Sequence, residues 1–269
     1  MSDFFHIVVC GGVVPDPLQT LEPATTPGTP SLKNEGMLPA VLDPWAGHAL
    51  YEAANLAKQF AGSRVWLVSL APRAKLQQVM MTVAQKVAFE LVAVDGPAGG
   101  FTDATETGLV LAQAIRGIAG LDRSRLLVFG GWESASRGAG ITLQIVGEEL
   151  GIHDQFQNVD QITVEANGAL KVLERIEGGR HQVSECAGAP LVAGWATGNL
   201  PEPRNDPRVG MANMRGVMPA LQRAKSTKLS GDGVEFLEVS LPKQQRQTKV
   251  VEGMGREQIA QEIVRWMQG

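Results

Sequence analysis

The sequence predicts an α/β protein in which a mostly parallel sheet is flanked by helices. Short apolar runs alternate with amphipathic segments over the first 150 residues, and this alternation is typical of parallel strands joined by helical crossovers. The first run, at residues 6–10, is rich in β-branched residues and is followed at once by two glycines, as expected where a buried strand ends. These two observations favour a Rossmann-like arrangement.

The expected strands of this sheet are residues 6–10, 65–68, 91–94 and 126–129, and the expected helices begin at 43 and cover 75–89, 104–118 and 140–150. Asp43 and Pro44 mark the first helix start, because Asp caps free N–H groups and Pro suits the first helical position. Residues 15–42 are rich in Pro, Thr and Gly without a helical period. They predict a long functional loop with room for short strands.

The pattern changes after Gly151. Strand-like runs at residues 161–164 and 169–176, followed by a third run after a second turn, predict a small antiparallel meander. A buried strand at 191–195, a short helix within 200–228, an extended polar stretch and an amphipathic helix at 256–267 are expected next. We expect residues 1–228 to form the α/β nucleotide-binding domain and residues 229–269 an extended arm that packs on a partner subunit.

Composition excludes several classes of protein. The net charge is −4, which does not favour nucleic-acid binding. The sequence contains no apolar run of the roughly 18 residues that a transmembrane helix needs, and its first residues do not resemble a secretory signal. Cys10 and Cys186 lie far apart, without the spacing of metal ligands. A reduced, cytoplasmic compartment is expected.

The glycine- and serine-rich segment from Gly130 to Gly140 follows a predicted strand and precedes a predicted helix. Small residues expose backbone N–H groups, serines add hydroxyl donors, and the helix start is electropositive, so the segment favours anion binding. It is neither a Walker motif nor a dinucleotide fingerprint, and a plain loop of small residues is the alternative. The glycines after Cys10 allow a ligand close to the backbone, but alone they indicate only a turn.

No catalytic constellation is apparent, since neither a zinc spacing nor a nucleophile elbow occurs. Trp45 at the first helix start is interpreted as a core residue, with a ring-facing position as the alternative. The stretch from Arg204 to Lys228 carries six Arg and Lys residues. It is either a solvated loop or a docking surface for an acidic partner.

Five short motifs, in this order, resemble those of the beta subunit of electron transfer flavoproteins. They are Val14-Pro15-Asp16, Asp43-Pro44-Trp45, the strand end Val68-Ser69-Leu70-Ala71-Pro72, Glu174 to Gly179, and Pro201-Glu202-Pro203-Arg204. The resemblance runs from about residue 6 to the C-terminus. It implies an electron carrier rather than an enzyme, paired as a heterodimer with an alpha subunit that holds most of an FAD. It also implies a structural AMP, a flavin dehydrogenase as electron donor and a quinone oxidoreductase as acceptor.

The same resemblance implies residue roles. The nucleotide site would be lined by Cys10, Asp43, Leu70, Gly131, Ser136, Arg137, Gly138, Ala139, Gly140, Ile141 and Thr142. Trp45 would approach the flavin ring, which reverses the interpretation from composition. In a recognition loop near residues 196–216, Leu200 would anchor the dehydrogenase, accompanied by Pro201, Glu202, Pro203 and Arg204.

The sequence also departs from the family pattern. The usual Asp-x-Asp-Thr-Gly-Gln loop appears here as Ser136 to Ile141, with only the glycine kept. This weakens the alternative of an electron-bifurcating type with a second FAD, and it brings the chain closer to carriers that serve trimethylamine- or dimethylglycine-type dehydrogenases. Residues 205–212 look like an insertion. A nucleotide-hydrolysing protein is a further alternative, but the loop lacks the required lysine or metal-binding carboxylate, and a structural subunit with an empty pocket is another.

Overall fold

The computed structural model describes residues 4–24, 30–97, 99–136, 138, 140–230, 233–234, 236–243, 248 and 250–268. The chain divides into two compact units, residues 1–239 and residues 240–269. The first unit contains one nine-stranded sheet, a two-stranded sheet and the helices around them. In the second unit, the described residues 256–268 form a helix.

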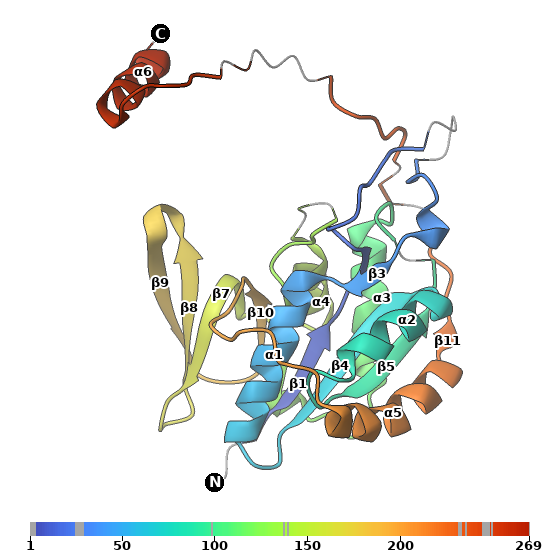
Figure 1. Ribbon diagram of the computed structural model, residues 1–269. Helices are drawn as coiled ribbons and strands as arrows, with labels where there is room; N and C mark the ends of the chain where they lie inside the picture. Colours follow the sequence, from blue (N-terminus) through green and yellow to red (C-terminus); the bar gives the residue numbers. More distant parts are fainter. Residues whose placement is uncertain are drawn as a thin grey trace. The chain divides into compact units, whose positions relative to one another are not determined.

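The large sheet has the strand order β11-β5-β4-β1-β6-β10-β7-β8-β9 (Figure 1). Its pairs from β11 to β7 are parallel, whereas β7-β8 and β8-β9 are antiparallel. The strands are β1 (His6–Cys10), β4 (Arg64–Ala71), β5 (Glu90–Asp95), β6 (Leu126–Gly131), β7 (Gln155–Val164), β8 (Leu170–Ile176), β9 (Arg180–Cys186), β10 (Leu191–Trp195) and β11 (Lys225–Ser226). The prediction of a mostly parallel sheet with an antiparallel meander is confirmed. The meander extends the main sheet, because β7 pairs with β10.

Helices cover both faces of this sheet (Figure 1). They are α1 (Pro44–Gln59), α2 (Arg73–Val83), α3 (Ala104–Arg116), α4 (Thr142–Glu149) and α5 (Pro207–Gln222). Side chains of β1 alternate between two apolar clusters: Ile7 and Val9 pack with residues of α1, α2 and α5, and Val8 packs with residues of α3 and α4. The strands therefore read as continuous apolar runs because both faces are buried.

Two elements differ from the prediction. The helix expected over residues 75–89 ends at Val83. Asn213 of α5 binds the chain beyond that point, donating to the carbonyl oxygens of Ala84 and Val87 and accepting from the N–H of Phe89. The helix expected within 200–228 is not short but has 16 residues. Six of the eight residues that looked like an insertion, 207–212, form its first turns.

The long segment between β1 and α1 contains short strands, as the sequence allowed. β2 (Val13–Pro15) pairs with β3 (Ala40–Leu42) in antiparallel fashion, and the 3-10 helix η1 (Glu35–Met37) lies between them in the chain. Two further 3-10 helices lie elsewhere: η2 (Arg123–Arg125) before β6 and η3 (Glu177–Gly179) between β8 and β9. The N–H of Asp43 donates to the carbonyl oxygen of Gly12 at 2.8 Å. The segment between β1 and α1 therefore ends close to the end of β1, just before α1 begins.

Residues 240–269 contain α6 (Arg256–Gln268), whose apolar residues are all exposed: Ile259, Ile263, Val264, Trp266 and Met267. The described residues between 229 and 255 form neither helix nor strand. The final amphipathic helix matches the prediction. Within the described part of the chain, every helix is too short or too polar to cross a membrane.

Candidate functional site

A hollow lies at the carboxyl ends of β1 and β6. From β1 the chain proceeds outward to β4 and β5 and then returns to β6 on the other side of β1, so this is the point at which the strand order reverses and at which α/β sheets bind ligands. The centres of water-sized molecules can occupy about 120 Å³ of this hollow, which is open to solvent on one side. Its lining residues are Cys10, Gly12, Val13, Val14, Asp43, Ala46, Leu70, Gly99, Thr107, Leu111, Gly130, Gly131, Glu133, Ser134, Ser136, Gly140, Thr142 and Leu143.

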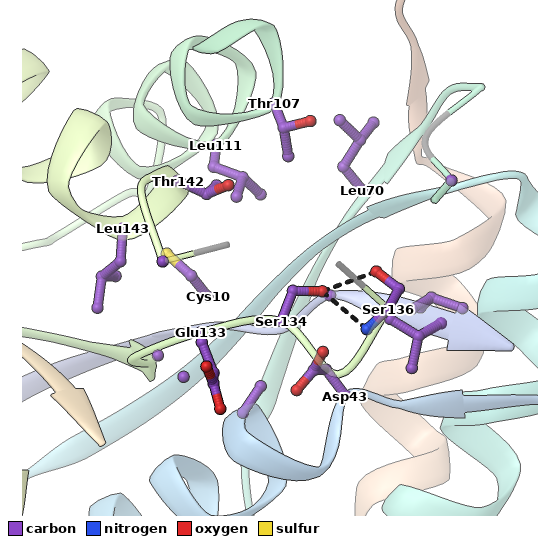
Figure 2. Close-up of a pocket in the computed structure, with 18 residues that line it drawn as sticks. Cys10, Asp43, Leu70, Thr107, Leu111, Glu133, Ser134, Ser136, Thr142 and Leu143 are labelled. Carbon is purple, nitrogen blue, oxygen red and sulfur yellow. Dashed lines mark hydrogen bonds between the residues drawn. The ribbon is translucent and has the colours of Figure 1, made fainter. Parts of the chain in front are cut away.

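The loop from β6 to α4 forms one wall of this hollow. Ser134 and Ser136 share a hydrogen bond of 2.8 Å between their hydroxyl oxygens (Figure 2), and α4 begins at Thr142. A Cβ atom at Gly131 would lie 2.5 Å from the Cβ of Trp45, and one at Gly140 would overlap the carbonyl oxygen of Trp132. Glycine is therefore required at both positions for the loop to pack this closely. Hydroxyl groups and a helix start near exposed backbone are typical of an anion site.

Asp43 joins this loop to α1. Its carboxylate accepts the N–H of Trp45 at 3.0 Å, as the predicted helix cap, and the N–H of Ala135 in the loop at 2.9 Å. The side chain is buried. Burial raises the pKa of Asp43, although the hydrogen bonds from Ala135 and Trp45 oppose that shift. The main role of Asp43 is therefore structural, because its carboxylate ties the loop that forms the wall of the hollow to the start of α1.

The opposite wall is less polar. Figure 2 shows Thr107, Leu111 and Thr142 across the hollow from Ser134, Ser136 and Asp43. Cys10 is buried at the end of β1, and this burial raises the pKa of its thiol to about 12. The thiol is consequently neutral and unsuited to nucleophilic chemistry. Among the described residues, no group of three His, Cys, Asp or Glu side chains is arranged to hold a metal.

Seven of the residues predicted for the nucleotide site line this hollow: Cys10, Asp43, Leu70, Gly131, Ser136, Gly140 and Thr142. Gly138 and Ile141 belong to the same loop but do not line it, and Arg137 and Ala139 lie outside the described residues. Ser134, in the loop predicted to bind an anion, also lines the hollow, whereas Thr107 and Leu111 were not predicted to line it. Thr107 and Leu111 are one turn apart on α3. From the sequence alone, they are predicted only to belong to a helix.

Trp45 is half-buried and does not belong to either apolar cluster, so the core position favoured from composition is wrong. Its ring meets that of Trp132 edge to face, with 6.3 Å between the centroids. The indole N–H of Trp132 is buried, and no described residue accepts a hydrogen bond from it. An aromatic pair of this kind offers an apolar edge beside the hollow.

The predicted recognition loop crosses α1 on its way from β10 to α5 (Figure 1). The N–H of Asn199 donates to Glu52 of α1 at 2.9 Å, and Glu202 forms an ion pair of 2.8 Å with Lys86. Pro201, Glu202 and Arg204 are exposed, whereas Leu200 and Pro203 are half-buried. The residues predicted to contact a partner are thus on the surface of α1, away from the lining of the hollow.

Comparison with known families decides what kind of protein carries this hollow. Residues 34–227, well over half of the chain, match the electron transfer flavoprotein domain. The chain belongs to this family. The match to the electron transfer flavoprotein domain includes Asp43, the glycine- and serine-rich loop and the segment that crosses α1, and it ends before residues 240–269. The comparison with curated proteins found no match.

Proposed function

We propose that this electron transfer flavoprotein chain is the beta subunit of a heterodimeric carrier. In this proposal a larger alpha subunit holds most of the FAD, and the chain supplies position and shielding, while the flavin supplies the redox chemistry. The chain has no catalytic residue of its own in this account, and we place the carrier in the cytoplasm. The observation that carries the proposal is the donor-rich hollow at the reversal of strand order in a chain of this family.

The hollow suits an adenine mononucleotide, and we propose AMP. Gly131 and Gly140 let the loop pack closely against Trp45 and Trp132, and Ser134, Ser136 and Thr142 would donate to the phosphate beside the start of α4. Glu133 would accept from ribose hydroxyls, and Leu70 and Leu111 would face the base. The loop lacks the Thr-Gly-Gln sequence typical of a second FAD, which favours AMP over the bifurcating alternative. Trp45 is the residue that would meet the flavin edge.

Two surfaces would meet partners. The exposed apolar side chains of α6 fit a helix that packs on the alpha subunit, because such an apolar stripe is rarely left in water. Leu200 to Arg204, with the basic residues after them, would dock a flavin dehydrogenase that donates electrons. A quinone oxidoreductase would accept them.

A tagged form of the full chain tests the pairing. When purified from its native cells, the chain should carry a larger, FAD-containing protein in a 1:1 ratio. Deletion of residues 240–269 should lower recovery of that protein by about tenfold or more, because the lost contacts of one helix exceed 1.4 kcal/mol. Deletion of residues 1–3 is the control. A yellow, monomeric chain without a larger partner, or full recovery after the deletion, would contradict the proposal.

A further inference from the structure

We propose that Glu52 of α1 is a positioning residue that fixes the turn at residues 198–200 and so presents Leu200 to the partner. This inference rests on the proposed docking role of the loop, and it adds the residue that holds the loop in shape. The turn lies on the surface of α1.

The contacts of Glu52 are specific. Its Oε1 atom accepts the N–H of Asn199 at 2.9 Å. This bond ends on the backbone of the residue that precedes Leu200, the proposed anchor of the dehydrogenase. A charge-assisted bond to a backbone N–H is about twice as strong as a neutral one, so the carboxylate holds the backbone immediately before Leu200.

Gly198 makes this approach possible. Its φ angle is +61°, in the left-handed region, and a Cβ atom there would lie 2.5 Å from the Oε1 of Glu52. Any larger residue would be strained and would push the turn away from the carboxylate. Gly198 therefore allows the turn to lie directly against the Glu52 carboxylate, which accepts the N–H of Asn199.

Contacts on either side limit where the turn can go. Before the turn, Arg175 donates to the hydroxyl of Thr197 at 2.9 Å. Arg175 is itself held by Asp160 through bonds of 3.0 and 2.7 Å. Within the turn, the side chain of Asn199 donates to the carbonyl oxygen of Asp160. After it, Glu202 pairs with Lys86, whose side chain is only 15% exposed. Leu200 lies between these two attachments, where Glu52 provides the intervening contact.

Hydrogen exchange of the full chain, purified with the subunits that accompany it, tests this role. In Glu52→Ala the amide of Asn199 should exchange about tenfold faster or more, because its acceptor is lost. Glu52→Gln should restore most of the protection, since its amide oxygen accepts the same bond. Glu185→Ala, which removes an exposed carboxylate on β9, is the matched control. Unchanged exchange in Glu52→Ala overturns the inference.

A kinetic measurement separates this inference from the docking proposal. The electron donor is a flavin dehydrogenase from the same cells that reduces the wild-type complex. We expect Glu52→Ala to raise its KM several-fold at unchanged kcat and flavin content, and Leu200→Ala to raise KM at least as much. An unchanged KM in Leu200→Ala overturns the docking role, even if exchange shows that Glu52 holds the turn. An unchanged KM in Glu52→Ala alone overturns the positioning role and leaves docking intact.

Discussion

Replacement of Gly140 with alanine is expected to remove most of the nucleotide from the complex. The new Cβ would overlap the carbonyl oxygen of Trp132, and a backbone atom cannot move aside as a flexible side chain can. The loop that carries Ser134 and Ser136 would have to shift away from the start of α4. Because the proposed phosphate contacts depend on that geometry, we expect at least about a tenfold loss of bound nucleotide, equivalent to 1.4 kcal/mol.

The measurement is the amount of nucleotide released on denaturation per mole of chain. Gly216→Ala is the control, since a Cβ there meets nothing within 4 Å and alanine suits the helix in which it lies. Nucleotide content equal to that of the wild type in Gly140→Ala would show that this loop does not hold the ligand.

Asp43→Ala should be the most destabilising single change near the site. It removes the cap of α1, worth about 1 kcal/mol, and leaves the N–H of Ala135 without its acceptor, which costs about 1–3 kcal/mol. We expect the free energy of unfolding of the purified complex to fall by about 2–4 kcal/mol in a denaturant titration. Asp103→Ala removes the cap of α3, a less buried Asp bonded to Thr105, and should cost only about 1 kcal/mol. Equal losses in the two variants would contradict a joining role for Asp43.

The difference in stability between the wild type and Asp43→Ala should depend on pH, in a direction set by the pKa of Asp43. Burial raises the pKa of Asp43 above its value in the unfolded chain, so the folded state releases this proton less readily than the unfolded state. The contribution of Asp43 to stability is therefore greatest below the unfolded pKa and declines as pH rises to the raised pKa. The stability difference between the wild type and Asp43→Ala should shrink over that interval, and a difference that grows with pH would contradict the assignment.

The fold was predictable where local pattern is sufficient. Strands buried on both faces are continuous apolar runs, and Asp43-Pro44 is a helix start whatever surrounds it. The end of α2 was not predictable, because Asn213, more than 120 residues later, supplies the hydrogen bonds that replace helical ones after Val83. The attachment of the meander was also hidden, since the pairing of β7 with β10 depends on strands that are not consecutive in the chain.

The same distinction applies to the site. The glycine- and serine-rich loop was recognisable because its residue types have few other uses between a strand and a helix. Thr107 and Leu111 were not recognisable, because their part in the hollow depends on how α3 packs beside α4. Glu52 likewise lies in an ordinary helix face, and only the path of the loop over α1 brings the N–H of Asn199 to its carboxylate.

The nucleotide content of the native complex tests the central claim most directly. The complex is purified through a tag on this chain and denatured, and the released nucleotides are identified and quantified by mass spectrometry. The proposal predicts one AMP per chain and one FAD per pair of subunits. Two FAD molecules per pair and no AMP, or no adenine nucleotide other than the single FAD, would contradict the assignment of the hollow as an AMP site.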